Sequence, residues 1–252
     1  AGATEIYRVG GAHAIAGMAH GTKTIAPVQK IFGPGNAYVV AAKRLLVGRV
    51  SIDLLPGPSE VLVLADGTAN PAFAAADILA QAEHGSGHER CWLVSTSAKV
   101  IGAVEKEIAK QLPQRSRRDY IRKVLAKNAW LIQVASRAEA IALANRLAPE
   151  HCEVMLKDAA AAAKQITTAG ALFLGNFSPT VTGDYVAGPS HTLPTGGAGA
   201  SFSGLTVDMF QRRTSVVQYT PASLKKSIAA IEQFAGVEGL DAHGRSASIR
   251  LD

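Results

Sequence analysis

Apolar runs of strand length alternate with helical patterns in this chain, and this alternation restricts its possible folds more than any other feature. Between residues 60 and 156, strands are expected at 60–65, 91–95, 130–134 and 152–156, and helices at 71–83, 98–112, 117–127 and 136–147. Strands joined by helices pair in parallel, and a parallel sheet needs a layer of helices on each face. The pattern therefore predicts an α/β fold with a mostly parallel sheet.

Two glycine turns precede this segment. Residues 5–9 are expected to form a strand that leads through Gly10 and Gly11 into a helix at 14–19. Residues 30–32 lead through Gly33-Pro34-Gly35-Asn36 into a helix at 37–47. A glycine turn that opens a helix offers backbone N–H groups to an anion or a polar cofactor. Asn36 is also a good helix N-cap, so ligand binding and simple capping both stay open for it.

Breaks in the pattern divide the chain further. Residues 50–55 are another expected strand, after which Pro56-Gly57-Pro58 ends regular pairing and predicts a domain boundary. An alanine-rich helix is expected at 158–167 and a last helix at 223–234. The stretch 178–203 is dense in Gly, Pro, Ser and Thr, and a loop of that length is usually functional or disordered.

Composition narrows the class of protein. The 252 residues are 48% hydrophobic, and no apolar run approaches about 18 residues, so we expect a globular core and no membrane span. The net charge of +6 permits an anionic partner, but the densest basic stretch, 115–123, is typical of a solvated helix face, so we expect no nucleic acid partner. Two cysteines, Cys91 and Cys152, suit a reducing cytoplasm. The chain has no initiator Met, and we expect a fragment of a longer protein.

One pair of polar residues stands at the end of the expected helix 71–83. Gln81 and His84 are three residues apart, so they project from one face of the last turn, where an amide oxygen and an imidazole can share one cation. A capped helix end with a solvated histidine explains the same residues without a ligand.

Three further pairs stand near other element ends: Glu150 with His151, Asp184 with His191, and Glu238 with His243. Taken singly, each pair is explained as structural or exposed. Taken together, four of the residues form a set of nitrogen and oxygen donors without a thiolate, which suits a zinc-like ion with room for substrate: Gln81, His84, Asp184 and His243. Glu150 and His151 remain as acid–base groups.

Short motifs spread over the whole chain carry a family resemblance. They are Val9-Gly-Gly-Ala-His-Ala-Ile-Ala16, Gly33-Pro-Gly-Asn-Ala-Tyr-Val39, Gly57-Pro-Ser-Glu-Val-Leu-Val63, Gln81-Ala-Glu-His84, Pro149-Glu-His151, Gly183-Asp-Tyr185, His191-Thr-Leu-Pro-Thr195 and Ala242-His243. In this order they resemble the later part of the histidinol dehydrogenases. That resemblance implies two incomplete Rossmann-like units with mostly parallel sheets, at 1–61 and 62–205, and a C-terminal helical arm at 206–252. It also implies a homodimer with shared active sites, because the arm crosses to the partner subunit.

The resemblance further implies a reaction and a role for each matching residue. The reaction is the oxidation of L-histidinol to L-histidine through L-histidinal, the last steps of histidine biosynthesis, with zinc and two NAD in succession. His151 matches the general base, and Glu150 matches the group that activates water on the aldehyde. The zinc ligands match Gln81, His84, Asp184 and His243, which with His151 also face the substrate; further substrate contacts match Ser59, His191 and Glu238, and a cofactor contact matches Asn36.

One position departs from the family pattern. Where the family usually has glutamine in a cofactor-facing motif, this chain has His13. Imidazole replaces one amide hydrogen bond but not its paired donor and acceptor, so the change bears on cofactor affinity rather than on metal binding.

Two other functions stay open. One is a related zinc and NAD dehydrogenase for another small alcohol such as a sulfonated diol, which Glu238 disfavours because its charge repels a sulfonate. The other is an inactive fragment that only binds metal.

Overall fold

The computed structural model describes residues 2–252, which divide into two compact units. The first unit extends to Phe210 and the second is Gln211–Asp252. The division of the chain at residues 61 and 205 stays a prediction.

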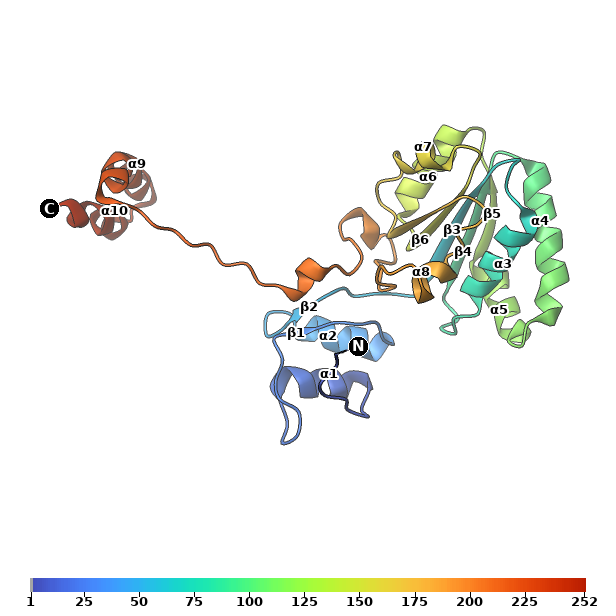
Figure 1. Ribbon diagram of the computed structural model, residues 1–252, viewed down its shortest axis with the longest axis horizontal. Coiled ribbons are helices and arrows are strands. Elements are labelled where there is room, and N and C mark those ends of the chain that lie inside the picture. The colour runs from blue at the N-terminus through green and yellow to red at the C-terminus, as the bar shows by residue number, and fades with distance from the viewer. Residues whose placement is uncertain (1) are drawn as a thin grey trace. The chain divides into compact units, whose positions relative to one another are not determined.

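A five-stranded parallel sheet forms the centre of the first unit (Figure 1). Its strand order is β5-β4-β3-β6-β7, with all four neighbouring pairs parallel. The strands are β3 (Glu60–Ala65), β4 (Arg90–Ser95), β5 (Ala129–Gln133), β6 (His151–Met155) and β7 (Ala171–Leu174). The predicted α/β class with a mostly parallel sheet is therefore confirmed.

The central strand β3 shows why the sheet needs cover on both sides. Val61 and Val63 pack into one apolar cluster, and Leu62 and Leu64 pack into a second cluster on the opposite face, because successive strand side chains alternate. All four side chains are fully buried. The helices on the first face are α3 (Pro71–Ala82), α4 (Ala98–Gln111) and α5 (Arg118–Asn128), and those on the second are α6 (Arg137–Leu147) and α7 (Ala159–Ala163).

A smaller two-stranded parallel sheet lies earlier in the chain. It pairs β1 (Lys30–Ile31) with β2 (Ser51–Ile52), and α1 (Gly11–His20) and α2 (Ala37–Leu45) accompany it. The strand expected at 5–9 is wrong. Ile6 is 85% exposed, and no described residue supplies a strand to pair with this segment, so it has no ladder to join.

Several predicted boundaries move. The long loop at 178–203 contains α8 (Val181–Tyr185) and the 3₁₀ turn η2 (Ala198–Ala200). The alanine-rich helix expected at 158–167 is α7, which ends at Ala163 and is therefore shorter than expected. There are two more 3₁₀ turns. The turn η1 (Leu112–Gln114) follows α4, and the turn η3 (Val207–Phe210) ends the first unit.

The second unit is a helical pair. It consists of α9 (Pro221–Glu238), α10 (Asp241–Ser248) and the 3₁₀ turn η4 (Ile249–Leu251). The helices approach closely because Gly244 lacks a side chain; a Cβ there would lie 3.4 Å from the Ala235 Cβ. The last predicted helix, 223–234, is longer in the structure, so Glu238 is the final residue of α9 and does not follow the helix.

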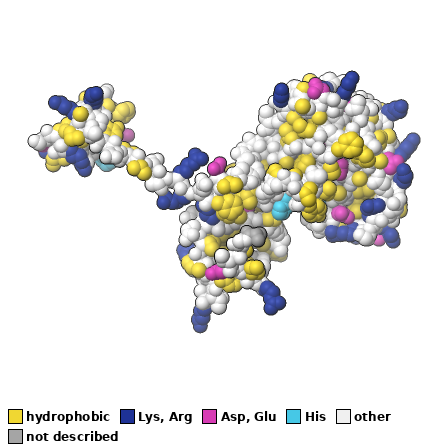
Figure 2. Space-filling view, viewed as in Figure 1, with side chains coloured by type: hydrophobic (Ala, Val, Ile, Leu, Met, Phe, Trp, Pro, Cys, Tyr) yellow, Lys and Arg dark blue, Asp and Glu magenta, His cyan; other side chains and the backbone are white. Residues whose placement is uncertain are grey.

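Surface charge shows no single dominant patch on the face drawn in Figure 2, where Lys and Arg side chains are scattered among other types. The basic stretch 115–123 belongs to α5 and the turn before it, and Arg122 pairs with Asp119 at 2.7 Å on the exposed side of that helix. None of the helices formed by residues 2–252 is long and apolar enough to cross a membrane.

Candidate active site

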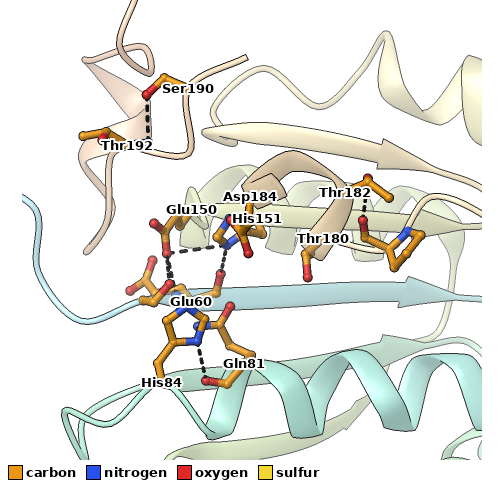
Figure 3. Close-up of polar contacts among 12 residues, drawn as sticks. Glu60, Gln81, His84, Glu150, His151, Thr180, Thr182, Asp184, Ser190 and Thr192 are labelled. Carbon is orange, nitrogen blue, oxygen red and sulfur yellow. Dashed lines mark hydrogen bonds and ion pairs between the residues drawn. The ribbon is translucent and has the colours of Figure 1, made fainter. Parts of the chain in front are cut away.

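Polar side chains from four elements meet at the amino edge of the large sheet (Figure 3). Glu60 and His151 are the first residues of the neighbouring strands β3 and β6. The helix α3 follows β3 and runs back to the same edge, which returns Gln81 and His84 to the strand starts. Doubly wound sheets usually bind ligands at the carboxyl ends of their strands, so this placement departs from that rule, as the position of Glu150 and His151 before a strand already indicated.

The Glu150 carboxylate is fixed by two donors. Its Oε2 accepts the Ser59 hydroxyl at 2.5 Å and the Glu60 backbone N–H at 2.9 Å. The side chain is 7% exposed. Short hydrogen bonds to a carboxylate are strong, so the position of this group is well determined.

His151 is oriented by a backbone carbonyl. Its Nδ1 lies 2.9 Å from the Glu60 carbonyl oxygen, which can only accept, so Nδ1 carries the proton and donates it. In neutral imidazole the lone pair is then on Nε2, which lies 3.9 Å from Asp184 Oδ1. His151 is 3% exposed, and it lines a cavity together with Asp184 and Glu150.

Asp184 is presented by the short helix α8. The preceding Gly183 packs against the Phe173 ring, where a Cβ would lie 2.8 Å from Phe173 Cζ, so only glycine fits without a shift. This contact seats α8 on β7 and brings the half-buried Asp184 side chain toward His151.

Gln81 and His84 share the last turn of α3, as the spacing predicts. His84 Nδ1 lies 3.2 Å from the Gln81 carbonyl oxygen and 3.5 Å from Gln81 Nε2. Donation from Nδ1 to that carbonyl leaves the His84 Nε2 lone pair for another ligand. Gln81 is buried and His84 is exposed.

Two cavities of about 260 Å³ each meet at His84 and Asp184, which line both. One cavity is also lined by Gln81 and Arg117. The other contains the acid–base candidates and two residues expected to contact substrate: Ser59, Glu150, His151 and His191. With Gln81, His84 and Asp184 included, seven of the eleven residues with predicted site roles therefore line this pair of cavities.

Four predicted residues lie elsewhere, and one of them, Asn36, lines a separate cavity. Glu238 and His243 belong to the second unit, where both are exposed on α9 and α10. His13 is an exposed residue of α1. Within residues 2–252, no three His, Cys, Asp or Glu side chains gather closely enough to hold a metal ion. Of the four predicted zinc ligands, three line one cavity in the first unit: Gln81, His84 and Asp184.

Asn36 is a helix cap in the structure. Its Oδ1 accepts the N–H groups of Tyr38 and Val39, each at 3.1 Å, which leaves its amide nitrogen for a ligand. A separate cavity of about 560 Å³ is lined by Asn36 and by Gly35, Arg44, Pro56, Gly57, Ser86 and His88. The glycine turn before it is held by a buried ion pair between Lys43 and Asp53, and Asp53 also accepts the Gly33 N–H at 2.6 Å.

The two thiols take no part in this site. Burial raises the pKa of the Cys91 thiol to about 12, and burial also raises the pKa of Cys152 above its ordinary value. Both cysteines therefore stay protonated at neutral pH, which agrees with a donor set that contains no thiolate.

Two buried carboxyl groups near the site were missed by sequence reasoning. Asp77 of α3 is 7% exposed and Glu153 of β6 is 0% exposed. Burial raises the pKa of Asp77 to about 6. Burial and the nearby Asp77 carboxyl raise the pKa of Glu153 well above its ordinary value. A charged residue inside an apolar helix or strand pattern is the signal that would have found them. The Glu60 carbonyl, which orients His151, could not be found from the sequence, because every residue has a backbone carbonyl.

Comparison with known proteins places the chain. Residues 1–251 match the family model described as histidinol dehydrogenase. The chain is 49% identical over all its residues to a histidinol dehydrogenase from Rhodopseudomonas palustris and 47% identical to one from Geobacillus kaustophilus, and it spans about 58% of the length of such relatives. The crystal structure of histidinol dehydrogenase from Elizabethkingia anophelis superposes with a TM-score of 0.94 at 40% identity, covering 99% of this chain and 57% of that one. The chain belongs to the histidinol dehydrogenase family.

Proposed function

We propose that the full-length protein oxidises L-histidinol to L-histidine through L-histidinal in histidine biosynthesis, with NAD as the oxidant and zinc as the bound metal. The observation that carries the proposal is the orientation of His151: the Glu60 carbonyl holds Nδ1, Nε2 lies 3.9 Å from Asp184, and His151 lines one cavity with His84 and Asp184. Membership of the histidinol dehydrogenase family supports the same reaction.

His151 is the general base in this proposal. A hydroxyl group bound in the cavity gives its proton to Nε2, because Nδ1–H is held by the Glu60 carbonyl at 2.9 Å. The resulting imidazolium is stabilised by Asp184 at 3.9 Å and by Glu150, whose Oε2 lies 3.5 Å from Nδ1. A bound NAD would supply the hydride acceptor for each oxidation, while His151 holds the proton that the hydroxyl group releases.

Glu150 activates water for the second oxidation. Ser59 and the Glu60 N–H occupy its Oε2, so the second oxygen, Oε1, is the one that accepts a proton from water attacking the aldehyde. The hydrated aldehyde that results is the substrate of the second oxidation. Since both carboxylate and imidazole line one cavity, the aldehyde does not have to leave between the two steps.

The residues present fit a zinc ion. Gln81, His84 and Asp184 supply an amide oxygen, an imidazole nitrogen and a carboxylate oxygen around a common cavity, and the His84 tautomer leaves Nε2 free to ligate. The fourth proposed ligand is His243. Bound zinc supplies Lewis acidity and orients the amino alcohol.

A polar cofactor fits the separate cavity at the start of α2. The amide nitrogen of Asn36 is free of the cap, and the cavity wall contains the cationic Arg44 beside the glycine turn. Cofactor binding there is supported by the family resemblance of the Gly33–Val39 motif. His13 is proposed as a second contact.

Ser59, His191 and Glu238 are proposed as further substrate contacts, Glu238 because its charge suits the substrate ammonium group. Glu238 is the last residue of α9, and His243 follows it five residues later in α10. The family resemblance supports a homodimer with shared active sites, and light scattering is expected to give the full-length protein twice its chain mass.

A substrate panel separates this function from its two alternatives. We expect the full-length, zinc-loaded protein to form NADH from L-histidinol and not from a sulfonated diol, because Glu238 attracts an ammonium group and repels a sulfonate. NADH absorbance is measured with each alcohol at equal concentration. Turnover of the diol alone would assign a different substrate, and zinc binding with no turnover of any alcohol would support the metal-binding alternative.

A further inference from the structure

The buried carboxyl group of Glu153 contacts the helix that presents Asp184. Glu153 lies two residues after His151 on β6 and is 0% exposed. Its Oε1 accepts the Thr180 backbone N–H at 3.0 Å, and Thr180 is the buried N-cap residue of α8. In the described part of the chain, Glu153 Oε2 has no hydrogen-bond donor in standard geometry, and its polar neighbour is the Asp77 carboxyl. Burying such a group is costly, so a compensating role is expected.

The helix α8 cannot hold its own position. It has five residues, too few to be stable in isolation, and the Thr180 side chain gives its N-terminus no cap. Outside contacts must fix it, and they are the packing of Gly183 on Phe173 and the bond from Thr180 N–H to Glu153. The bond from Thr180 to Glu153 is therefore one of the contacts that hold the helix carrying Asp184.

The same carboxyl group faces α3. Asp77 lies one turn before Gln81 on that helix, and the Asp77 carboxyl is close enough to Glu153 to raise its pKa. Burial raises the pKa of Asp77 to about 6, and burial together with the Asp77 carboxyl raises the pKa of Glu153 well above its ordinary value, so both shifts favour the neutral form of a carboxyl here.

We propose that Glu153 is a positioning residue, which fixes the start of α8 on β6 and so holds Asp184 beside His151 and across the cavity from Gln81 and His84. The consequence for metal and substrate binding rests on the proposed function. The contact between Glu153 and Thr180 does not rest on the proposed function, and it can be tested in the metal-free protein.

Four variants of the full-length protein separate positioning from general stability. Glu153→Gln keeps an oxygen that can accept the Thr180 N–H, whereas Glu153→Leu removes it at similar volume. The double variant Asp77→Leu with Glu153→Leu also removes the second buried carboxyl, because replacing both partners by apolar groups protects folding while Thr180 N–H still lacks its acceptor. Val154→Ala trims a buried side chain on the same strand without touching α8.

Hydrogen exchange in the metal-free protein is the first measurement. The amides of Gly183, Val186 and Ala187 are protected by bonds to the Thr180 and Thr182 carbonyls at 2.7 to 3.0 Å. Loss of one hydrogen-bond acceptor is expected to speed their exchange about tenfold in both leucine variants, relative to the α4 amides. Glu153→Gln is expected to match the parent protein, and Val154→Ala should change α4 and α8 alike.

Zinc affinity and the KM for L-histidinol are the second measurement. A displaced ligand helix is expected to weaken zinc binding about 10-fold to 100-fold in the leucine variants, with Glu153→Gln restoring it. Unchanged α8 exchange in the double leucine variant would overturn the contact. Faster exchange with unchanged zinc affinity and KM would overturn the positioning role. If the parent protein itself binds no zinc, the proposed function fails while the exchange result still decides the contact.

Discussion

His151→Asn in the full-length protein is expected to lower turnover of L-histidinol by about 10²-fold or more. The asparagine amide nitrogen can still donate to the Glu60 carbonyl, so the surroundings of residue 151 stay intact. The asparagine amide oxygen, however, cannot take up a proton at neutral pH. Because the substrate and metal contacts remain, KM and zinc content should change little. Steady-state kinetics with saturating NAD and elemental analysis measure the two effects.

The matched control is His20→Asn, which changes an exposed histidine at the end of α1. This variant should keep the turnover of the parent protein. A fall in turnover of less than tenfold in His151→Asn would mean that another group accepts the proton, and the assignment of the base would then be wrong.

His84→Ala is expected to weaken zinc binding on the order of 10²-fold or more. Changes to groups that only support a ligand already cost up to about 100-fold, and this variant removes the ligand atom itself. His84 also lines both site cavities, so its loss opens the junction between them. Competition with a chromophoric chelator gives the affinity, and elemental analysis gives the occupancy after dialysis.

His88→Ala is the control for metal content, since it removes an exposed histidine from the loop after the same helix. It should retain full zinc occupancy. Equal zinc affinity in His84→Ala and the parent protein would exclude His84 as a ligand, even if catalysis were impaired.

The sheet was largely predictable because its signals are local. β3 and β4 are continuous apolar runs, which is what burial on both faces of a parallel sheet requires. The helix α4 also ends within one residue of its predicted boundary. The strand expected at 5–9 failed for the opposite reason, since a strand needs a partner and the sequence pattern says nothing about one.

The helix α8 was missed because its stability is not local. Its residues lie in a stretch dense in turn formers, and its place depends on the Phe173 ring and the Glu153 carboxyl, which are distant in sequence. The longer α9 was missed for a related reason. Its last turn is stabilised by packing of Ala235 on α10 and by a left-handed Gly239, with φ of 69°, rather than by a change in residue pattern.

Residue types in the site could be predicted, but their proximity could not. The spacing of Gln81 and His84 places both on one helix face, and that pairing is seen. The approach of His151 to Asp184 depends instead on the pairing of β6 with β7 and on the seat of α8. The tautomer of His151 depends on the Glu60 carbonyl, which the register of β3 against β6 brings within 2.9 Å.

The amount of NADH formed per L-histidinol consumed shows whether one site performs both oxidations. We expect two NADH from the full-length parent protein, with no free aldehyde. In Glu150→Gln the water for the second step loses its proton acceptor, so the ratio should fall toward one and trapped aldehyde should appear. One NADH per histidinol and an aldehyde product from the parent protein would mean that one site does not perform both oxidations.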